Sequence, residues 1–158
     1  MYPKNYHSPH AQFSVMFFTR LNRKIISLSF KKMVKIGTHS GHFHADEALA
    51  CFMLKQLAEY SDAEIVRSRD LKVLAECDIV VDVGATFDPE KKRFDHHQRE
   101  FAETMKTLGI LDFNTKLSSA GLVYAYYGKA VINAVTGLDK ASPKMDIVYE
   151  KVRKPTEA

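Results

Sequence analysis

The sequence has 158 residues, of which 46% are hydrophobic and 27% charged, with 7 Gly and 5 Pro. These proportions exclude a disordered or fibrous chain, and the length allows one domain with an appendage rather than two catalytic domains. The formal net charge is +4, yet residues 1–45 carry seven Lys or Arg and no Asp or Glu. Because the excess basic charge belongs to this N-terminal arm, it does not indicate a nucleic-acid-binding face on the folded part.

The arm, residues 1–33, has the pattern of a basic amphipathic helix. Its apolar residues Phe17, Leu21, Ile25 and Leu28 are spaced by four, four and three positions, with basic residues between them. An acid-free, Arg-bearing amphipathic leader is typical of a mitochondrial presequence, which predicts the mitochondrial matrix. The alternative is a disordered or mistranslated extension, because a shorter product could start at Met33. No apolar run approaches the ~20 residues of a membrane span, so we expect no membrane partner.

Strand and helix patterns alternate after the arm. Strands are predicted at 34–38, 63–67 and 78–84, and helices at 46–60, 71–75, 117–127 and 145–153. The run at 78–84 is almost continuously apolar, which is typical of a strand covered on both faces. Repeated strand–helix units of this length predict an α/β fold with a parallel sheet and right-handed crossovers.

A first cluster of histidines and a carboxylate lies in the turn after the first predicted strand. His39, His42, His44 and Asp46 lie within eight residues there, just before and at the start of a helix. This is the carboxyl edge of a parallel sheet, where open α/β proteins bind ligands. Taken singly, each could be a solvated loop histidine, with Asp46 capping the helix. Three imidazoles and a carboxylate together favour a ligand site.

Two further clusters follow later strands. Asp82 ends the buried run, where an unpaired carboxylate is costly unless it binds a cation or caps a turn. Asp95, His96 and His97 are adjacent and follow another strand-like segment. Imidazole nitrogen with carboxylate oxygen suits Mn²⁺, Zn²⁺ or Fe²⁺, and a carboxylate-rich set with a phosphate substrate favours Mn²⁺ or Mg²⁺. A parallel sheet would bring the three clusters to one edge, with enough ligands for two ions.

The motifs carrying these residues resemble a known family. Thr38-His39 with Phe43-His44-Ala45-Asp46-Glu47, then Asp82-Val83-Gly84, then Phe94-Asp95-His96-His97, occur in that order. They resemble the melanocyte-proliferating-gene exonuclease family, also called uncharacterised protein family 0160, of the DHH phosphoesterase superfamily. The resemblance covers residues 34–152. It implies an N-terminal phosphoesterase domain and two-metal hydrolysis of RNA from a free 3′ end, in mitochondria and nucleus.

The resemblance also implies roles for individual residues. His39, His44 and Asp46 match the first superfamily motif, although His44 stands where that motif has a carboxylate. Asp82 would bridge the two ions, and His96 would be a further metal ligand. His97 and Asp95 would be catalytic, with His97 near the scissile phosphate. His42 has no counterpart in the motif and is expected to be a surface histidine.

One departure from the superfamily pattern concerns residues 34–158. A fourth motif with another metal-binding Asp, followed by a substrate-binding domain, is expected after this region, and the acidic residues downstream of residue 138 lack the expected context. The sequence therefore predicts an incomplete domain, truncated before its end. Two alternatives to an RNA exonuclease follow, namely a non-catalytic metal-binding fragment and a small-molecule phosphatase or pyrophosphatase on the same scaffold. The oligomeric state is left open.

Overall fold

The computed structural model describes residues 32–152, so the predicted presequence-like arm lies almost wholly outside the described residues. Its elements, in chain order, are β1 (Lys35–Thr38), α1 (Ala45–Lys55), β2 (Glu64–Arg67), α2 (Leu71–Ala75), β3 (Ile79–Val81), β4 (Phe87–Asp88), β5 (Arg93–Phe94), α3 (Ser119–Thr136) and α4 (Pro143–Val152). No helix among these residues is long and apolar enough to cross a membrane.

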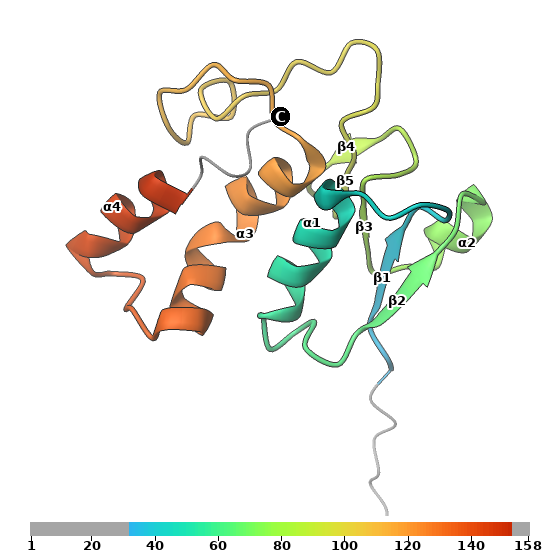
Figure 1. Ribbon diagram of the computed structural model, residues 1–158, viewed down its shortest axis with the longest axis horizontal. Helices are drawn as coiled ribbons and strands as arrows, with labels where there is room; N and C mark the ends of the chain where they lie inside the picture. Colours follow the sequence, from blue (N-terminus) through green and yellow to red (C-terminus); the bar gives the residue numbers. More distant parts are fainter. Residues whose placement is uncertain (1–31, 153–158) are drawn as a thin grey trace, which may run out of the picture. The chain divides into compact units, whose positions relative to one another are not determined.

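The strands form one sheet in the order β2-β1-β3-β5-β4 (Figure 1). All neighbouring pairs are parallel except β4 with β5, which are antiparallel. The predicted α/β fold with a parallel sheet is therefore confirmed, and β4 is an additional edge strand that the sequence analysis did not predict. The chain runs from β1 to β2 on one side and returns to β3 on the other side. The carboxyl ends of β1 and β3 thus flank the point where strand order reverses, the usual ligand position in such sheets.

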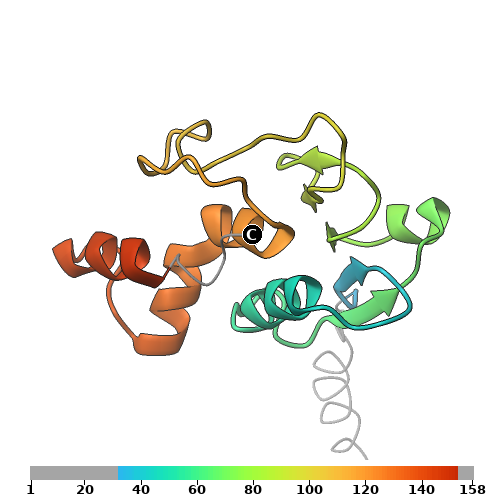
Figure 2. The same cartoon turned by 45° about the horizontal axis from the view of Figure 1, so that its top comes forward.

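Helices cover both faces of this sheet. Figures 1 and 2 show α1 and α3 side by side on one face, with α4 packed beside α3. On strand β3, Ile79 and Val81 belong to the core beneath these helices, whereas Val80 packs with Leu74 and Cys77 of the α2 region on the opposite face. This two-sided burial explains the continuous apolar run.

A close contact fixes α2 against the sheet. A Cβ atom added at Gly37 of β1 would lie 3.0 Å from Cys77 Sγ and 3.1 Å from Leu74 Cδ2. The small residue in β1 therefore lets the α2 region approach the strand that leads directly into the turn at His39.

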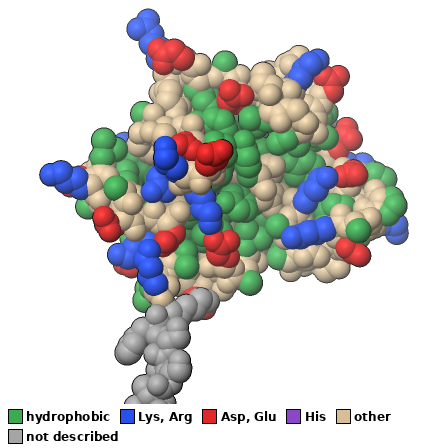
Figure 3. Space-filling view, turned by 180° about the vertical axis from the view of Figure 1, so that it is seen from behind, with side chains coloured by type: hydrophobic (Ala, Val, Ile, Leu, Met, Phe, Trp, Pro, Cys, Tyr) green, Lys and Arg blue, Asp and Glu red, His purple; other side chains and the backbone are tan. Residues whose placement is uncertain are grey.

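Apolar side chains gather in one band on the surface opposite to the view of Figure 1. Figure 3 shows a band of hydrophobic side chains across the middle of this face, with charged side chains on both sides of it and at the margin. Among the described residues, no histidine side chain is visible on this face. The clustered histidines are thus absent from this side of the described part of the chain.

Helix α3 is longer than predicted because it continues through Gly128. A glycine after an apolar helical run often marks a helix end. Here it lies inside the helix, where a Cβ would come within 2.7 Å of Tyr149 Cε2 and 2.8 Å of Tyr124 Cε2. These two rings stack with centroids 4.8 Å apart, and the Tyr124 hydroxyl donates to Tyr149 O at 2.6 Å. Gly128 therefore makes room for the contact that attaches α4.

We expect Gly128→Ala to destabilise the protein, although Ala is ordinarily the better helix residue by ~1 kcal/mol. Both tyrosine rings are buried and hydrogen-bonded, so relieving the overlap should cost about 1–3 kcal/mol. Thermal denaturation should show a Tm several degrees lower. Val135→Ala, at an exposed position of the same helix, is the control and should leave Tm nearly unchanged. A higher Tm for Gly128→Ala would contradict this account.

Candidate metal centre

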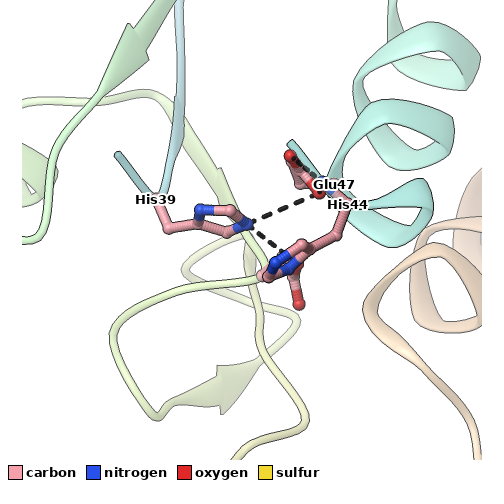
Figure 4. Close-up of side chains that lie close together, drawn as sticks. His39, His44 and Glu47 are labelled. Carbon is pink, nitrogen blue, oxygen red and sulfur yellow. Dashed lines mark hydrogen bonds and ion pairs between the residues drawn. The ribbon is translucent and has the colours of Figure 1, made fainter. Parts of the chain in front are cut away.

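The first group of candidate ligands lies between the end of β1 and the start of α1. Figure 4 shows His39, His44 and Glu47 pointing toward one another. His39 directly follows β1 and is buried, with Nε2 3.4 Å from Glu47 Oε2 and 3.6 Å from Asp82 Oδ2. The rings of His39 and His44 have centroids 5.0 Å apart. One oxygen or nitrogen from each of His39, His44, Glu47 and Asp82 lies within 4.8 Å of the others.

The N-terminus of α1 places Glu47 in this group. His44 is the N-cap residue, and its backbone N–H donates to Glu47 Oε1 at 2.7 Å and to Oε2 at 2.9 Å. A Glu three residues after the N-cap often folds back in this way. Burial opposes ionisation of Glu47, but the hydrogen bond from the His44 backbone and the nearby histidines outweigh it, so the pKa of Glu47 lies below its ordinary value. Glu47 is therefore a carboxylate at neutral pH, although it is 1% exposed.

Asp82 connects this group with a second one. It follows β3 and is 4% exposed, with a φ of 58°, a left-handed conformation that Asp tolerates better than most residues. Its Oδ2 faces His39, whereas Oδ1 lies 3.8 Å from His96 Nε2 and 3.7 Å from His97 Nδ1. The expected approach of His39 and Asp82 is confirmed. The two oxygens of one carboxylate thus face two separate sets of histidines.

Electrostatics at Asp82 favour a bound cation. Burial, together with the negative charge of Asp46, raises the pKa of Asp82 above its ordinary value. Asp82 Oδ1 and His39 Nε2 are buried and make no hydrogen bond. Buried polar atoms without partners are costly. A divalent ion coordinated by the carboxylate and imidazole groups would give such atoms a partner. The residues present therefore fit the predicted metal.

The second group contains Asp82, His96 and His97, each offering a ligand atom within 4.8 Å of the others. Asp46 Oδ2 lies 3.6 Å from His96 Nε2. The same carboxylate accepts hydrogen bonds from Ser119 N at 3.0 Å and Ala120 N at 2.6 Å, at the start of α3. An anionic side chain at a helix N-terminus is stabilised by the exposed amides and the helix dipole. Asp46 therefore fixes α3 beside the histidines as well as facing His96.

Asp95 lies outside both groups and holds the backbone around them. Its Oδ2 accepts from Ala85 N at 2.6 Å, and its Oδ1 accepts from the backbone amides of His96 and His97. Oδ1 also lies 2.6 Å from His97 Nδ1. A carboxylate partner keeps the proton on Nδ1, which leaves the lone pair on Nε2 of His97. His97 is 60% exposed, so this nitrogen belongs to an accessible ring.

The histidines and carboxylates considered in the sequence analysis thus fall into three sets. His39, His44, Asp82, His96 and His97 converge in the two groups, and Asp46 lies beside the second. Asp95 makes the contacts of a residue that positions His97. His42 is exposed and outside both groups. The metal-binding and catalytic roles expected of the site residues remain predictions. Glu47 is the residue that sequence reasoning missed; its place three residues after an N-cap was the available indication.

Basic residues near the third cluster are held by the chain itself. Lys92 Nζ donates to Glu59 Oε1 at 2.8 Å and to the Tyr60 hydroxyl at 2.9 Å, and Arg93 donates to Cys77 O at 3.0 Å. These contacts tie the charges of Lys92 and Arg93 to structural partners rather than directing them to a nucleic-acid backbone.

Comparisons with known proteins agree on one family. Residues 35–156 match the sequence model described as Uncharacterised protein family (UPF0160). The chain is 58% identical to a MYG1 protein of Caenorhabditis elegans over 74% of its length, and 51% identical to the MYG1 exonuclease of Homo sapiens over 75%. It is 47% identical to a MYG1 protein of Saccharomyces cerevisiae over 83%. These matches cover 34%, 32% and 37% of the relatives, so the chain spans about a third of their length. No solved structure matches it significantly.

Proposed function

Because this chain belongs to Uncharacterised protein family UPF0160, we propose that its site is the metal-dependent phosphodiesterase centre of a nuclease that removes nucleotides from the 3′ end of RNA. The printed name of the human relative supports the reaction class. The observation that carries the proposal is the position of Asp82, whose two carboxylate oxygens face two sets of histidines. A carboxylate in this position could bind two ions, one through each oxygen, and two ions held close together are the basis of two-metal hydrolysis.

The residues of the site would provide ligands for two ions. His39, His44, Glu47 and one oxygen of Asp82 would hold one ion, and the other oxygen of Asp82 with His96 would contribute to the second. Mn²⁺ is the proposed ion, since imidazole and carboxylate ligands are mixed, and Mg²⁺ is the alternative. Ions held there would act as Lewis acids toward a phosphoryl oxygen and make hydroxide available from water near neutral pH.

The chain's own residues would orient the substrate and move protons. His97 presents an accessible ring whose Nδ1 is fixed by Asp95, so Nε2 can exchange a proton with a leaving or attacking oxygen. Asp46 links the turn that contains His39 and His44 to the start of α3. This link fixes the position of that turn relative to His96. Both contacts limit the motion of groups that would have to stay aligned during hydrolysis.

Hydrolysis of a 5′-labelled single-stranded RNA in Mn²⁺ tests this function. We expect products shortened stepwise from the 3′ end, loss of activity in EDTA, and no shortening of a circular RNA. A parallel reaction with inorganic pyrophosphate separates a nuclease from a small-molecule phosphatase. Cleavage of pyrophosphate without shortening of RNA, or no hydrolysis of either with Mn²⁺ bound, would contradict the proposal.

A further inference from the structure

A pocket of about 450 Å³ lies beside the first ligand group, outside the two sets of candidate ligands except for one shared residue. Its walls come from the outer face of α1, from β2 and from the turn that precedes α1. Ala48, Cys51 and Phe52 line it from the helix, and Ile65 from the strand. This volume is in the range of small-molecule sites, about 300–1,000 Å³.

Aromatic and apolar side chains around this pocket are unusually accessible. Phe43 is 76% exposed, Phe52 59% and Ile65 45%. Single exposed apolar residues are common on protein surfaces, but a group of them around one pocket indicates a binding surface. Two of the three are flat rings, which offer stacking faces to another planar group.

Two basic side chains at the pocket are held in place by hydrogen bonds to the backbone. The guanidinium of Arg67 lies 3.8 Å from the centre of the Phe43 ring, and Arg67 Nη2 donates to Gly41 O at 3.2 Å. Lys55 Nζ donates to Ala63 O at 2.9 Å. The Thr38 hydroxyl is buried and has no hydrogen-bond partner. The pocket therefore combines aromatic faces, two cations and one unused hydrogen-bonding hydroxyl.

The pocket shares a wall with the candidate metal centre. Thr38 and Glu47 both line it; Thr38 directly precedes His39, and Glu47 lies 3.4 Å from His39. Arg67 also lies 3.8 Å from Glu47 Oε1. A group bound in the pocket would therefore be next to a phosphate held at the centre, with the positive charges of Lys55 and Arg67 nearby.

We propose that this pocket binds the nucleobase of a nucleotide whose phosphate lies at the metal centre, an inference that rests on the proposed nuclease function. A purine or pyrimidine ring matches the aromatic walls, since base–aromatic stacking does not require a particular sequence. The Thr38 hydroxyl supplies one hydrogen bond to a ring heteroatom. This arrangement predicts recognition of any base through Phe43 and Phe52, and orientation of the RNA end by the base rather than by Lys92 and Arg93.

The absence of tryptophan from the chain allows a direct test. Phe52→Trp places a single indole at the pocket, and Ile147→Trp places one at an exposed position of α4, where Ile147 is 56% exposed. In Mg²⁺ buffer, adenosine monophosphate should quench the emission of Phe52→Trp and leave that of Ile147→Trp unchanged. Ribose 5-phosphate, which lacks the base, should quench neither. The Ile147→Trp protein also corrects for light absorbed by the nucleotide.

A second variant measures the contribution of the ring. Phe52→Ala should weaken adenosine monophosphate binding by calorimetry about 10-fold, as expected for loss of one stacking partner. Ile147→Ala should bind like the parent protein, and both variants should keep the parent Tm because both side chains are exposed.

Three results would overturn the pocket assignment. They are no quenching of Phe52→Trp by the nucleotide, equal quenching by ribose 5-phosphate, and a blue shift of emission on raising protein concentration alone, which would assign the pocket to a second copy of the chain. The assay of RNA hydrolysis distinguishes the two proposals. Intact RNA hydrolysis without quenching rejects only the pocket, whereas quenching without any hydrolysis rejects only the nuclease function.

Discussion

Replacing Asp82 with Asn is expected to remove most of the thermal stabilisation that Mn²⁺ gives to this protein. An ion present at 100 times its dissociation constant stabilises the folded state by ~2.7 kcal/mol. Asp82 contributes an oxygen to both ligand groups. Altering residues that merely support metal ligands lowers metal affinity ~10- to 100-fold. Neutralising Asp82 itself should therefore weaken Mn²⁺ binding at least ~100-fold. At the same ion concentration the stabilisation should then fall to ~0.4 kcal/mol.

The same substitution should have the opposite effect when EDTA is present. Burial raises the pKa of Asp82 from 3.8, which means that ionising it in the folded protein costs stability. This cost is absent below pH 3.8 and is complete once the pH exceeds the raised value, so it applies at neutral pH. Asn carries no charge and tolerates the φ of 58°, so Asp82→Asn should raise Tm in EDTA while abolishing the Mn²⁺ shift.

Asp112→Asn is the matched control for this experiment. Asp112 has an 85% exposed side chain and pairs with Lys106, outside both ligand groups. The control should keep the full Mn²⁺ shift. A Mn²⁺ shift that survives in Asp82→Asn would place the ion elsewhere in the protein.

Asp95→Asn is expected to lower RNA hydrolysis ~10- to 100-fold while leaving Mn²⁺ binding nearly unchanged. The groups around this carboxylate are backbone amides and His97 Nδ1, which donates only in one tautomer. An Asn NH₂ would face a backbone N–H in either orientation of the amide, and with NH₂ on the His97 side the imidazole would shift its proton from Nδ1 to Nε2 so that Nδ1 can accept. The lone pair would then move from Nε2 to Nδ1, and the exposed nitrogen would lose its ability to accept a proton.

Two measurements separate this effect from simple unfolding. The buried mismatch should cost ~1–3 kcal/mol of stability, so hydrolysis is compared at a temperature where both proteins are folded. ¹⁵N NMR of the His97 ring reports the tautomer directly. Unchanged hydrolysis with an inverted tautomer would show that His97 moves no proton. An equal loss of Mn²⁺ binding would instead make Asp95 part of the metal centre.

The fold was predictable where a single local pattern dominates. The elements β1, β2, α2 and β3 appear where alternation, helix formers and the apolar run at 78–84 place them, because each pattern matches one environment in the fold. The strand β4 has only two residues and pairs with its neighbour after a short turn, which leaves too little sequence for a periodic pattern. Helix α3 runs past the predicted end at residue 127 because Gly128 makes room for Tyr149, a contact with a residue distant in sequence.

The residues of the candidate site were likewise predictable from the sequence only in part. His39, Asp82 and His96 were identified because polar residues at the ends of predicted strands share one edge of a parallel sheet. Glu47 was named only as part of the family motif, since its burial at the site depends on β1 and β3 lying next to α1. The pocket depends on Phe52 of α1 and Ile65 of β2 lining the same space, and no spacing along the chain contains that information.

The hydrogen bonds from α3 to Asp46 also bear on how the site assembles during folding. They join residues 73 and 74 positions apart, so they can form only after a long loop of chain has closed. Contacts of such high sequence separation carry a large entropic cost before they contribute stability, and they slow the folding of a domain. The histidine turn can therefore fold locally while the complete centre waits for docking of α3. Slow hydrogen–deuterium exchange at the Ser119 and Ala120 amides would mark the molecules in which this late step is complete.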